Sequence, residues 1–231
     1  NMRRLLLTIK YDGTEYHGWQ VQKNAVTVQE VLQNAVEKVF GSRLNVIGCS
    51  RTDSGVHANM YCLTLDTDMN IENENVVMAI NGFLPNDISV NNCQTVDIDF
   101  HPRYSCKSKE YIYIVNNAKI RDPFLARYSY YYRRSIDAEY LNKEAKAFIG
   151  SHDFSGFCSV KCDVEDTVRT VESFDVWRQN DLVYFKVSAD GFLYNMVRIM
   201  VGTLLFINEG KIGAGELKSV IDSCDRRRAG K

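Results

Sequence analysis

The sequence predicts an α+β protein built from two similar halves. The first half reads as strand, helix, two strands, helix and strand, and the second half repeats nearly the same order. This order is that of a split βαβ unit, the ferredoxin-like arrangement also found in RNA-recognition modules. No Pro-, Gly- or Ser-rich linker separates the halves. We therefore expect residues 1–104 and 105–231 to share one mainly antiparallel sheet, with the helices on one face.

The first half opens with a strand at Arg4–Lys10. A helix is expected at Val28–Phe40, because its apolar residues fall on one helical stripe. Thr27 and Glu30 have the spacing of a capping box at its start, and Gly41 ends it. The remaining elements are two strands, a helix and a strand, at Leu44–Cys49, Val56–Leu65, Glu74–Gly82 and Ile88–Val96.

The second half repeats this order. Asp137 is placed to cap a helix that runs to Ile149 and ends at Gly150. The repeat calls for one more strand at the end, where the sequence reads RRRAGK. The expected strands are Glu110–Val115, Arg127–Tyr132, Val168–Trp177 and Leu182–Ala189, and two further helices are expected at Phe192–Ile207 and Glu216–Cys224.

Composition limits the classes of function. Apolar residues make up 45% of the chain and charged residues 25%, with a net charge of −1, which is ordinary for a globular protein. Any nucleic-acid site must therefore be a local basic patch. Seven cysteines at unpaired spacings indicate reduced thiols in a cytoplasmic protein, and no apolar run approaches the ~20 residues that span a bilayer. Basic residues cluster at Arg3–Arg4, Arg103–Lys109, Arg127–Arg134 and Arg226–Arg228.

The segment SRTDSGVHA, residues 50–58, is the strongest candidate for chemistry. It is a short polar loop between two apolar strands, and it brings Arg51, Asp53 and His57 together. From the residues alone, an Asx-turn at Asp53 explains the pattern at least as well, because Asp before Ser-Gly is a common turn former. A histidine such as His57 is more often a packing or turn-bonding residue than a base.

Three further features carry weaker signals. Residues 100–115 alternate basic and aromatic side chains, which suits unstacked bases and phosphates but equally a half-buried strand with Tyr111 on one face. Arg198 lies in an apolar helix, where it needs a carboxylate partner unless it reaches the surface. A zinc site at His152, Cys158 and Cys162 matches no standard spacing.

Taken together, these segments resemble the TruA family of tRNA pseudouridine synthases. The resemblance covers nearly the whole chain, in six blocks in the family order. The family continues past RRxAG into a last strand, which has no counterpart after Lys231. The blocks are YDGTEYHGWQVQ with TVQ, SRTDSGVHA (the family usually has Gly where Ser50 stands), NGFLPNDI, FHPRYSCKSKEYIY, HDFSGF and GFLYNMVRIMVG.

The resemblance implies an active cleft between the halves and a homodimer that holds tRNA across both subunits. It implies isomerisation of uridine at positions 38, 39 and 40 of the anticodon arm, without metal or organic cofactor. Asp53 matches the family nucleophile, Arg198 its ionic partner, Tyr111 the tyrosine that stacks on the flipped uracil, and Arg51 the residue that displaces the base. Candidate RNA contacts are His57, Arg103, Lys107 and Lys109.

Two other functions compete with this interpretation. Split βαβ folds commonly bind single-stranded RNA, so the chain can be a non-catalytic RNA-binding module. Binding alone does not need a carboxylate facing phosphates, and the presence of Asp53, Tyr111 and Arg198 together favours an enzyme. An aspartate-nucleophile hydrolase of small molecules is the other alternative, but the sequence shows no second acid or metal site to support it.

Overall fold

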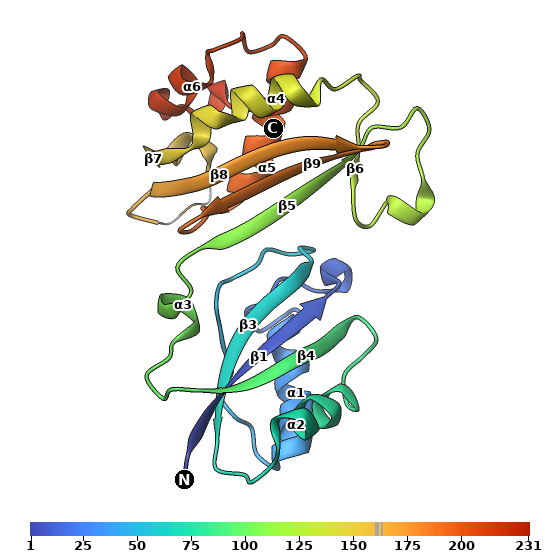
Figure 1. Cartoon of the computed structure of the whole chain (residues 1–231), viewed down its shortest axis with the longest axis vertical. Coiled ribbons are helices and arrows are strands. Elements are labelled where there is room, and N and C mark those ends of the chain that lie inside the picture. The colour runs from blue at the N-terminus through green and yellow to red at the C-terminus, as the bar shows by residue number, and fades with distance from the viewer. Residues whose placement is uncertain (160–161, 163) are drawn as a thin grey trace. The chain divides into compact units, whose positions relative to one another are not determined.

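In the computed structural model, which describes residues 1–159, 162 and 164–231, the chain divides into two units at Lys107 and Ser108. Each unit has its own sheet, helices and hydrophobic core (Figure 1). The expectation of an α+β fold with two split βαβ halves is confirmed. The strand ladders form one sheet in each unit, where a single shared sheet was expected. A junction that is not rich in Gly, Ser or Pro does not determine which strand edges pair, so the absence of such a linker could not settle this point.

The first unit contains a four-stranded antiparallel sheet in the order β2-β3-β1-β4. Alternate residues of β1 face its core, and Leu5, Leu7 and Ile9 are fully buried. The helices α1 and α2 pack over this face, and α2 lies against β4. The elements are β1 (Arg3–Tyr11), η1 (Gly13–Glu15), α1 (Val28–Phe40), β2 (Ile47–Gly48), β3 (Ala58–Thr67), α2 (Asn73–Asn81), β4 (Ile88–Val96) and α3 (Pro102–Ser105).

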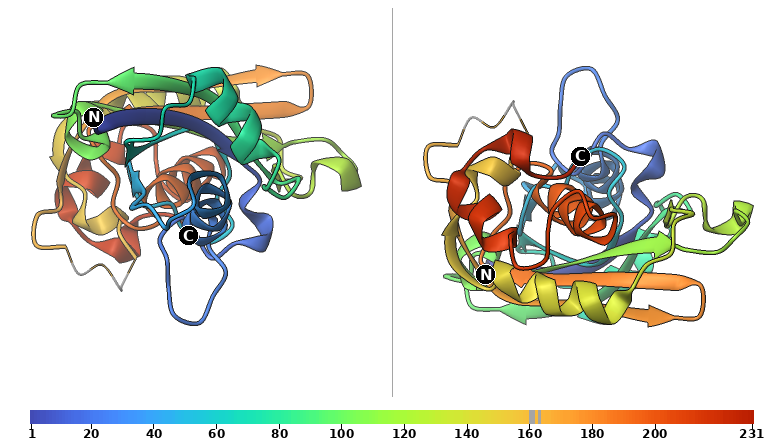
Figure 2. Two further views of the ribbon diagram at one scale, coloured as in Figure 1. Left: turned by 90° about the horizontal axis from the view of Figure 1, so that it is seen from below. Right: turned by 90° about the horizontal axis from the view of Figure 1, so that it is seen from above.

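The second unit contains a five-stranded sheet in the order β6-β5-β9-β8-β7. Its run β8-β9-β5 repeats the order β2-β3-β1, and β6 pairs with β5 in parallel where β4 pairs with β1. The helices lie on one side of β8 and β9 (Figure 2). The elements are β5 (Lys109–Asn116), η2 (Pro123–Leu125), β6 (Tyr130–Tyr131), α4 (Ala138–Ala145), η3 (Lys146–Phe148), β7 (Gly150–Asp153), η4 (Ser155–Phe157), β8 (Val168–Gln179), β9 (Leu182–Ala189), α5 (Met196–Asn208), α6 (Leu217–Ser223) and η5 (Arg226–Arg228).

Several expected elements are shorter in the structure. Only two residues of the strand expected at Leu44–Cys49 are a strand in the structure. The buried Gln29 side-chain amide donates a hydrogen bond to the Val46 carbonyl (2.9 Å), so this carbonyl does not pair with β3. The helix expected from Phe192 starts at Met196, since Asn195 has φ 60°, a left-handed conformation that an α-helix cannot include. The strand expected at Arg127–Tyr132 shrinks to β6, because the chain still turns at Tyr128, whose N–H bonds the carbonyl of Leu125.

The cysteines also depart from expectation. Cys158 and Cys162 form a disulfide, whereas reduced thiols were expected throughout. Their Cα atoms lie 6.2 Å apart, within the range that a disulfide bridges. Cys49, Cys62, Cys93 and Cys224 are free thiols. Within the described residues, no three His, Cys, Asp or Glu side chains group as a metal site requires, and no helix has the length and apolar content to cross a membrane.

Candidate active site

The loop that carries Asp53 lies in the first unit, between β2 and β3. Val56 donates its backbone N–H to the carbonyl of Asp53 (3.1 Å), and Gly55 has φ 79°. This is the tight turn that Asp-Ser-Gly favours. The Asp53 side chain is half-buried and that of Arg51 is exposed. The turn expected from the residues is therefore present, and it presents a carboxylate at the end of the sheet.

A second segment, residues 11–19, holds this loop in place. Trp19 donates its backbone N–H to the carbonyl of Thr52 (3.2 Å), and Gly55 donates to the carbonyl of Tyr16 (3.2 Å). The hydroxyl groups of Tyr11 and Thr52 are 2.8 Å apart. Hydrogen bonds therefore fix the backbone on both sides of Asp53.

Two glycines allow the segments to approach this closely. A Cβ atom on Gly18 would lie 2.4 Å from the carbonyl oxygen of Thr52, and Gly18 also has φ 77°. A Cβ atom on Gly13 would lie 2.0 Å from the carbonyl oxygen of Val56. Real Cβ atoms do not approach a backbone oxygen so closely. The YDGTEYHGW segment thus supplies glycine where the loop backbone requires it.

Aromatic residues anchor the start of the loop. Trp19 and Tyr61 are buried with their rings 4.5 Å apart, and the Tyr61 hydroxyl donates to the backbone oxygen of Ser50. Burial raises the pKa of Tyr61 well above its usual value, so the phenol stays protonated and remains a donor. Gly48 lies against both rings, where a Cβ atom would come within 2.1 Å of the Tyr61 hydroxyl.

His57 connects the loop to η1. Its Nδ1 accepts a hydrogen bond from the backbone N–H of Gly13 (2.9 Å) and lies 3.2 Å from Oδ1 of Asp12. The imidazole is half-buried. Among the possibilities that the sequence left open, this geometry favours a turn-bonding histidine, and contact with RNA remains a prediction.

Tyr111 and Arg198 lie in the second unit. Tyr111 is on β5, opposite Val187, and its ring meets the edge of Phe192 at 4.9 Å between centroids. Arg198 lies in the first turn of α5, which packs over β5, and its side chain is exposed. Burial raises the pKa of Tyr113, and the nearby charge of Arg198 opposes this rise. The guanidinium thus lies beside the tyrosine-bearing face of β5.

The basic candidates fall into two groups. Arg103 in α3, Lys107 and the Lys109 backbone at the start of β5 lie where the two units join in sequence, and the first two side chains are exposed. Arg226–Arg228 instead bond within their own segment. Arg226 donates to the carbonyl of Gly230 (2.7 Å), Arg227 pairs with Asp225 (3.1 Å) and Arg228 donates to Ser219 (3.1 Å).

The residue-level interpretation missed the part played by residues 11–19. Two glycines and three aromatic residues in nine positions, directly after a buried strand, were the available signal. Such a cluster is typical of a close backbone contact, although the sequence alone does not name the segment that it contacts.

The fold and the loop define a class of protein: an α+β protein of two split βαβ units, with a carboxylate presented on a loop that a glycine-containing segment holds in place. Residues 7–105 and 145–231 match the tRNA pseudouridine synthase family. The chain belongs to this family, whose members isomerise uridine to pseudouridine.

Relatives match over almost the full chain. The chain is 44% identical over 229 residues to tRNA pseudouridine synthase A of Thermoanaerobacter sp. (strain X514), covering 99% of this chain and 94% of the relative. It is 42% identical over 230 residues to the protein of the same name from Acetivibrio thermocellus, and 41% identical over 230 residues to that of Clostridium acetobutylicum. Each of these two alignments covers 100% of this chain and 94% of the relative.

Proposed function

We propose that this chain isomerises uridine to pseudouridine at positions 38, 39 and 40 of the tRNA anticodon arm, with Asp53 as nucleophile. The reaction breaks the bond from the anomeric carbon to N1 of uracil and forms one from the same carbon to C5. The proton leaves C5 and N1 gains one, so the isomerisation needs no oxidant or reductant. A carboxylate is a suitable covalent catalyst, attacking either the ring or the anomeric carbon.

The observation that carries this proposal is the way the Asp53 turn is held. An ordinary surface Asx-turn needs only its own local bonds. Here the backbone carbonyl of Thr52 and the N–H of Gly55 are both bonded to a distant segment, and Gly13 and Gly18 let that segment approach. Catalytic groups need such fixed placement, because small errors in position are costly in rate.

The other roles follow from the family motifs. Tyr111 stacks on the flipped uracil and is placed to take the C5 proton, and Arg198 keeps Asp53 ionised. Arg51 helps to displace the base, which is needed because the reacting atoms are inaccessible within a stacked arm. Arg103, Lys107, Lys109 and His57 contact the RNA backbone. We further propose that the enzyme is cytoplasmic, that it acts as a homodimer, and that it needs no cofactor.

Asp53→Asn tests the central role. Asn preserves the size of the side chain and is also a good turn former, so folding and tRNA affinity should remain. Pseudouridine formation should fall at least about 10³-fold, because the nucleophile is lost. The measurements are thermal melting, tRNA binding and single-turnover product formation. Product is detected by chemical derivatisation and mass analysis, since pseudouridine and uridine have equal mass.

Asp68→Asn is the matched control, because Asp68 is an exposed carboxylate of the same unit outside the loop. It should behave as the parent in all three measurements. Product formation by Asp53→Asn within tenfold of the parent would contradict the assignment. It would favour a turn role for Asp53 instead.

A further inference from the structure

The segment from β5 to α4 is strongly basic, and the candidate active site does not include it. Residues 118–134 contain five basic residues and one acidic residue, in a chain of net charge −1. They also contain five aromatic residues. The segment lies between the two ranges that match the family, so that match assigns it no role. The basic residues are Lys119, Arg121, Arg127, Arg133 and Arg134, and the acidic residue is Asp122.

This segment, which we call the β5–α4 loop, exposes large side chains. Phe124 in η2 is 89% exposed, Ile120 is 81% exposed and Tyr130 is 50% exposed. A folded protein gains nothing from ordering such side chains in water. Neighbouring exposed apolar groups commonly mark a binding surface.

The loop is nonetheless fixed to the rest of its unit. The Asn117 side-chain amide donates to the carbonyls of Tyr132 (2.7 Å) and Arg134 (2.8 Å), which ties the two ends of the loop together. The Asn117 backbone N–H bonds the carbonyl of Asp181 in the β8–β9 turn (2.7 Å). The Tyr131 hydroxyl donates to the carbonyl of Lys119 (2.7 Å), a further bond between the two ends of the loop. A preorganised loop loses little entropy when it binds.

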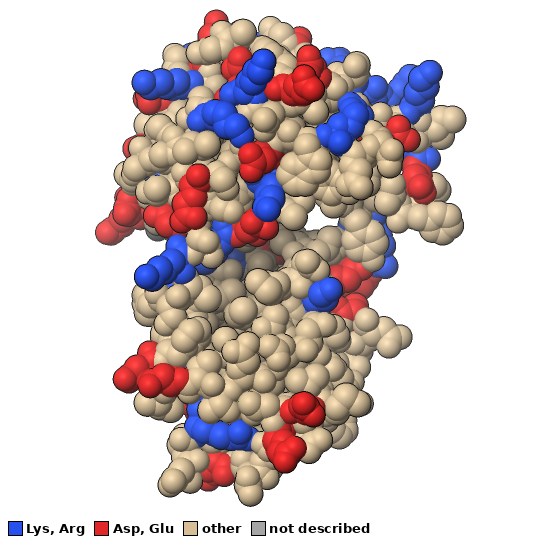
Figure 3. Space-filling model, viewed as in Figure 1, with Lys and Arg blue, Asp and Glu red and all other residues tan. Residues whose placement is uncertain are grey.

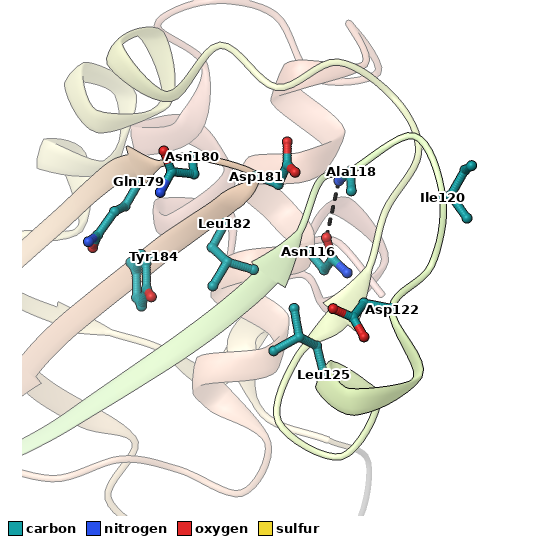
Figure 4. Close-up of a pocket in the computed structure, with 10 residues that line it drawn as sticks. All are labelled: Asn116, Ala118, Ile120, Asp122, Leu125, Gln179, Asn180, Asp181, Leu182 and Tyr184. Carbon is teal, nitrogen blue, oxygen red and sulfur yellow. Dashed lines mark hydrogen bonds between the residues drawn. The ribbon is translucent and has the colours of Figure 1, made fainter.

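A pocket of about 360 Å³ lies between this loop and the β8–β9 turn (Figure 4). Its lining includes two acidic residues, Asp122 and Asp181, and no basic one, so it is a poor place for a phosphate. Ile120 also lines the pocket, on the loop side, across from Leu182 and Tyr184 (Figure 4). The outer surface, not the pocket, is therefore the candidate for binding an anion.

The exposed basic residues of the loop differ in whether an acidic side chain of the protein pairs with them. Arg134 pairs with Glu209 at 2.5 Å. Lys119, Arg121 and Arg133 form no ion pair with any described residue. Lys and Arg side chains are visible along this end of the second unit, with a few acidic ones among them (Figure 3). The loop thus carries three exposed cations that have no ion pair among the described residues, together with the exposed ring of Phe124.

The charge of the loop favours RNA over a second copy of the chain. In a two-fold contact of this loop with itself, like charges would face each other, which is unfavourable. A polyanion satisfies the cations, and nucleobases stack on exposed aromatic rings. Phe124 offers such a ring within the same loop as Arg121.

We infer that the β5–α4 loop is a second tRNA-binding surface, in which Lys119, Arg121 and Arg133 contact phosphates and Phe124 stacks on a base. This inference rests on the proposed tRNA substrate. From Tyr111 to Asn116, β5 rises about 17 Å, so the loop lies well away from Tyr111 and contacts nucleotides outside the reacting one. It contributes to binding of the tRNA and not to the chemical step.

The test compares two double variants. Arg121→Gln/Arg133→Gln removes two cations of the loop, and Lys143→Gln/Lys218→Gln removes two exposed lysines from α4 and α6 as a charge-matched control. Loss of two phosphate contacts should flatten the plot of log K against log salt by about 1.4–1.8 and weaken binding roughly tenfold or more at 0.1 M salt. The single-turnover rate at saturating tRNA should stay within about twofold of the parent. Phe124→Ser should weaken binding without changing the salt slope.

The outcomes separate the two proposals. If the parent forms no pseudouridine in tRNA, the proposed function fails. If the parent is active and the two double variants bind tRNA alike, the loop inference alone is overturned. Light scattering on the same samples completes the test. A loop variant that loses tRNA binding only because it changes oligomeric state would assign the loop to a protein contact and overturn the inference.

Discussion

At the scale of single residues, Arg198 and Tyr113 of the second unit are electrostatically coupled. Burial raises the pKa of Tyr113, and the positive charge of Arg198 opposes this rise. The guanidinium of Arg198 is therefore near enough to stabilise a negative charge that forms at this tyrosine-bearing face. The same property is what the proposed pairing with Asp53 requires.

Arg198→Met should therefore raise the pKa of Tyr113 further, because burial then acts without opposition. If Arg198 also keeps Asp53 ionised, the pKa of Asp53 rises too, and the pH at which activity appears should shift upward. Tyrosine titration by ultraviolet absorption or NMR and a pH–rate profile measure the two effects. Arg198→Lys keeps the charge and is the control. An unchanged profile in Arg198→Met would show that the arginine is only a surface residue.

At the scale of elements, the Asp53 loop and residues 11–19 depend on each other through Gly18. Glycine is needed at position 18 for two reasons: the backbone has a positive φ, and it lies close to the carbonyl oxygen of Thr52. Gly41 shares only the first reason, with φ 76° and no atom within 4 Å of the position that a methyl group would take. The two glycines therefore separate backbone strain from steric contact.

Gly41→Ala should lower the free energy of unfolding by about 1 kcal/mol, the usual cost of a left-handed non-glycine residue. Gly18→Ala should cost about 2–3 kcal/mol, because the methyl group also meets the Thr52 carbonyl. Only Gly18→Ala should reduce pseudouridine formation beyond its effect on stability. Denaturant unfolding and single-turnover rates test both variants. If Gly18→Ala and Gly41→Ala lowered the free energy of unfolding equally, the close contact of Gly18 with the Asp53 loop would have no energetic role.

The sequence predicted elements well where local signals agreed. For α1, the apolar stripe, the Thr27 cap and the Gly41 stop all favoured Val28–Phe40, and the helix has those bounds. The predicted start of α5 was wrong. The apolar run begins at Phe192, but the helix begins only at Met196, after Asn195 in a left-handed conformation. The shortening of β2 depends on a side-chain bond from Gln29 across the unit. Such long-range bonds leave no pattern in the local sequence.

The site shows the same division. The polar loop around Asp53 could be recognised from its composition and position, but the residues alone favoured a structural Asx-turn over a catalytic role. The bonds to Tyr16 and Trp19 could not be read from spacing, because they join segments more than thirty positions apart. The disulfide between Cys158 and Cys162 was missed because a separation of four positions matches no standard paired spacing.

At the scale of the whole molecule, the near-neutral charge bears on assembly. A chain of net charge −1 has little basic surface to hold a tRNA alone. Pooling basic patches from two copies would solve this, and closed two-fold dimers are the commonest assemblies. We therefore predict a homodimer by light scattering, with and without tRNA, at concentrations where the enzyme is active. A stable monomer with full activity on tRNA would contradict it.

The bonds between the Asp53 loop and residues 11–19 also bear on local unfolding. Many functional loops open at little free-energy cost, independently of the core. This loop cannot open without also releasing Tyr16 and Trp19, which are buried in the core of the first unit. The loop therefore belongs to the same cooperative unit as the sheet, and the free energy needed to open it depends on the stability of β1 and α1. A substitution in that core, far from the nucleophile, would loosen the carboxylate as well.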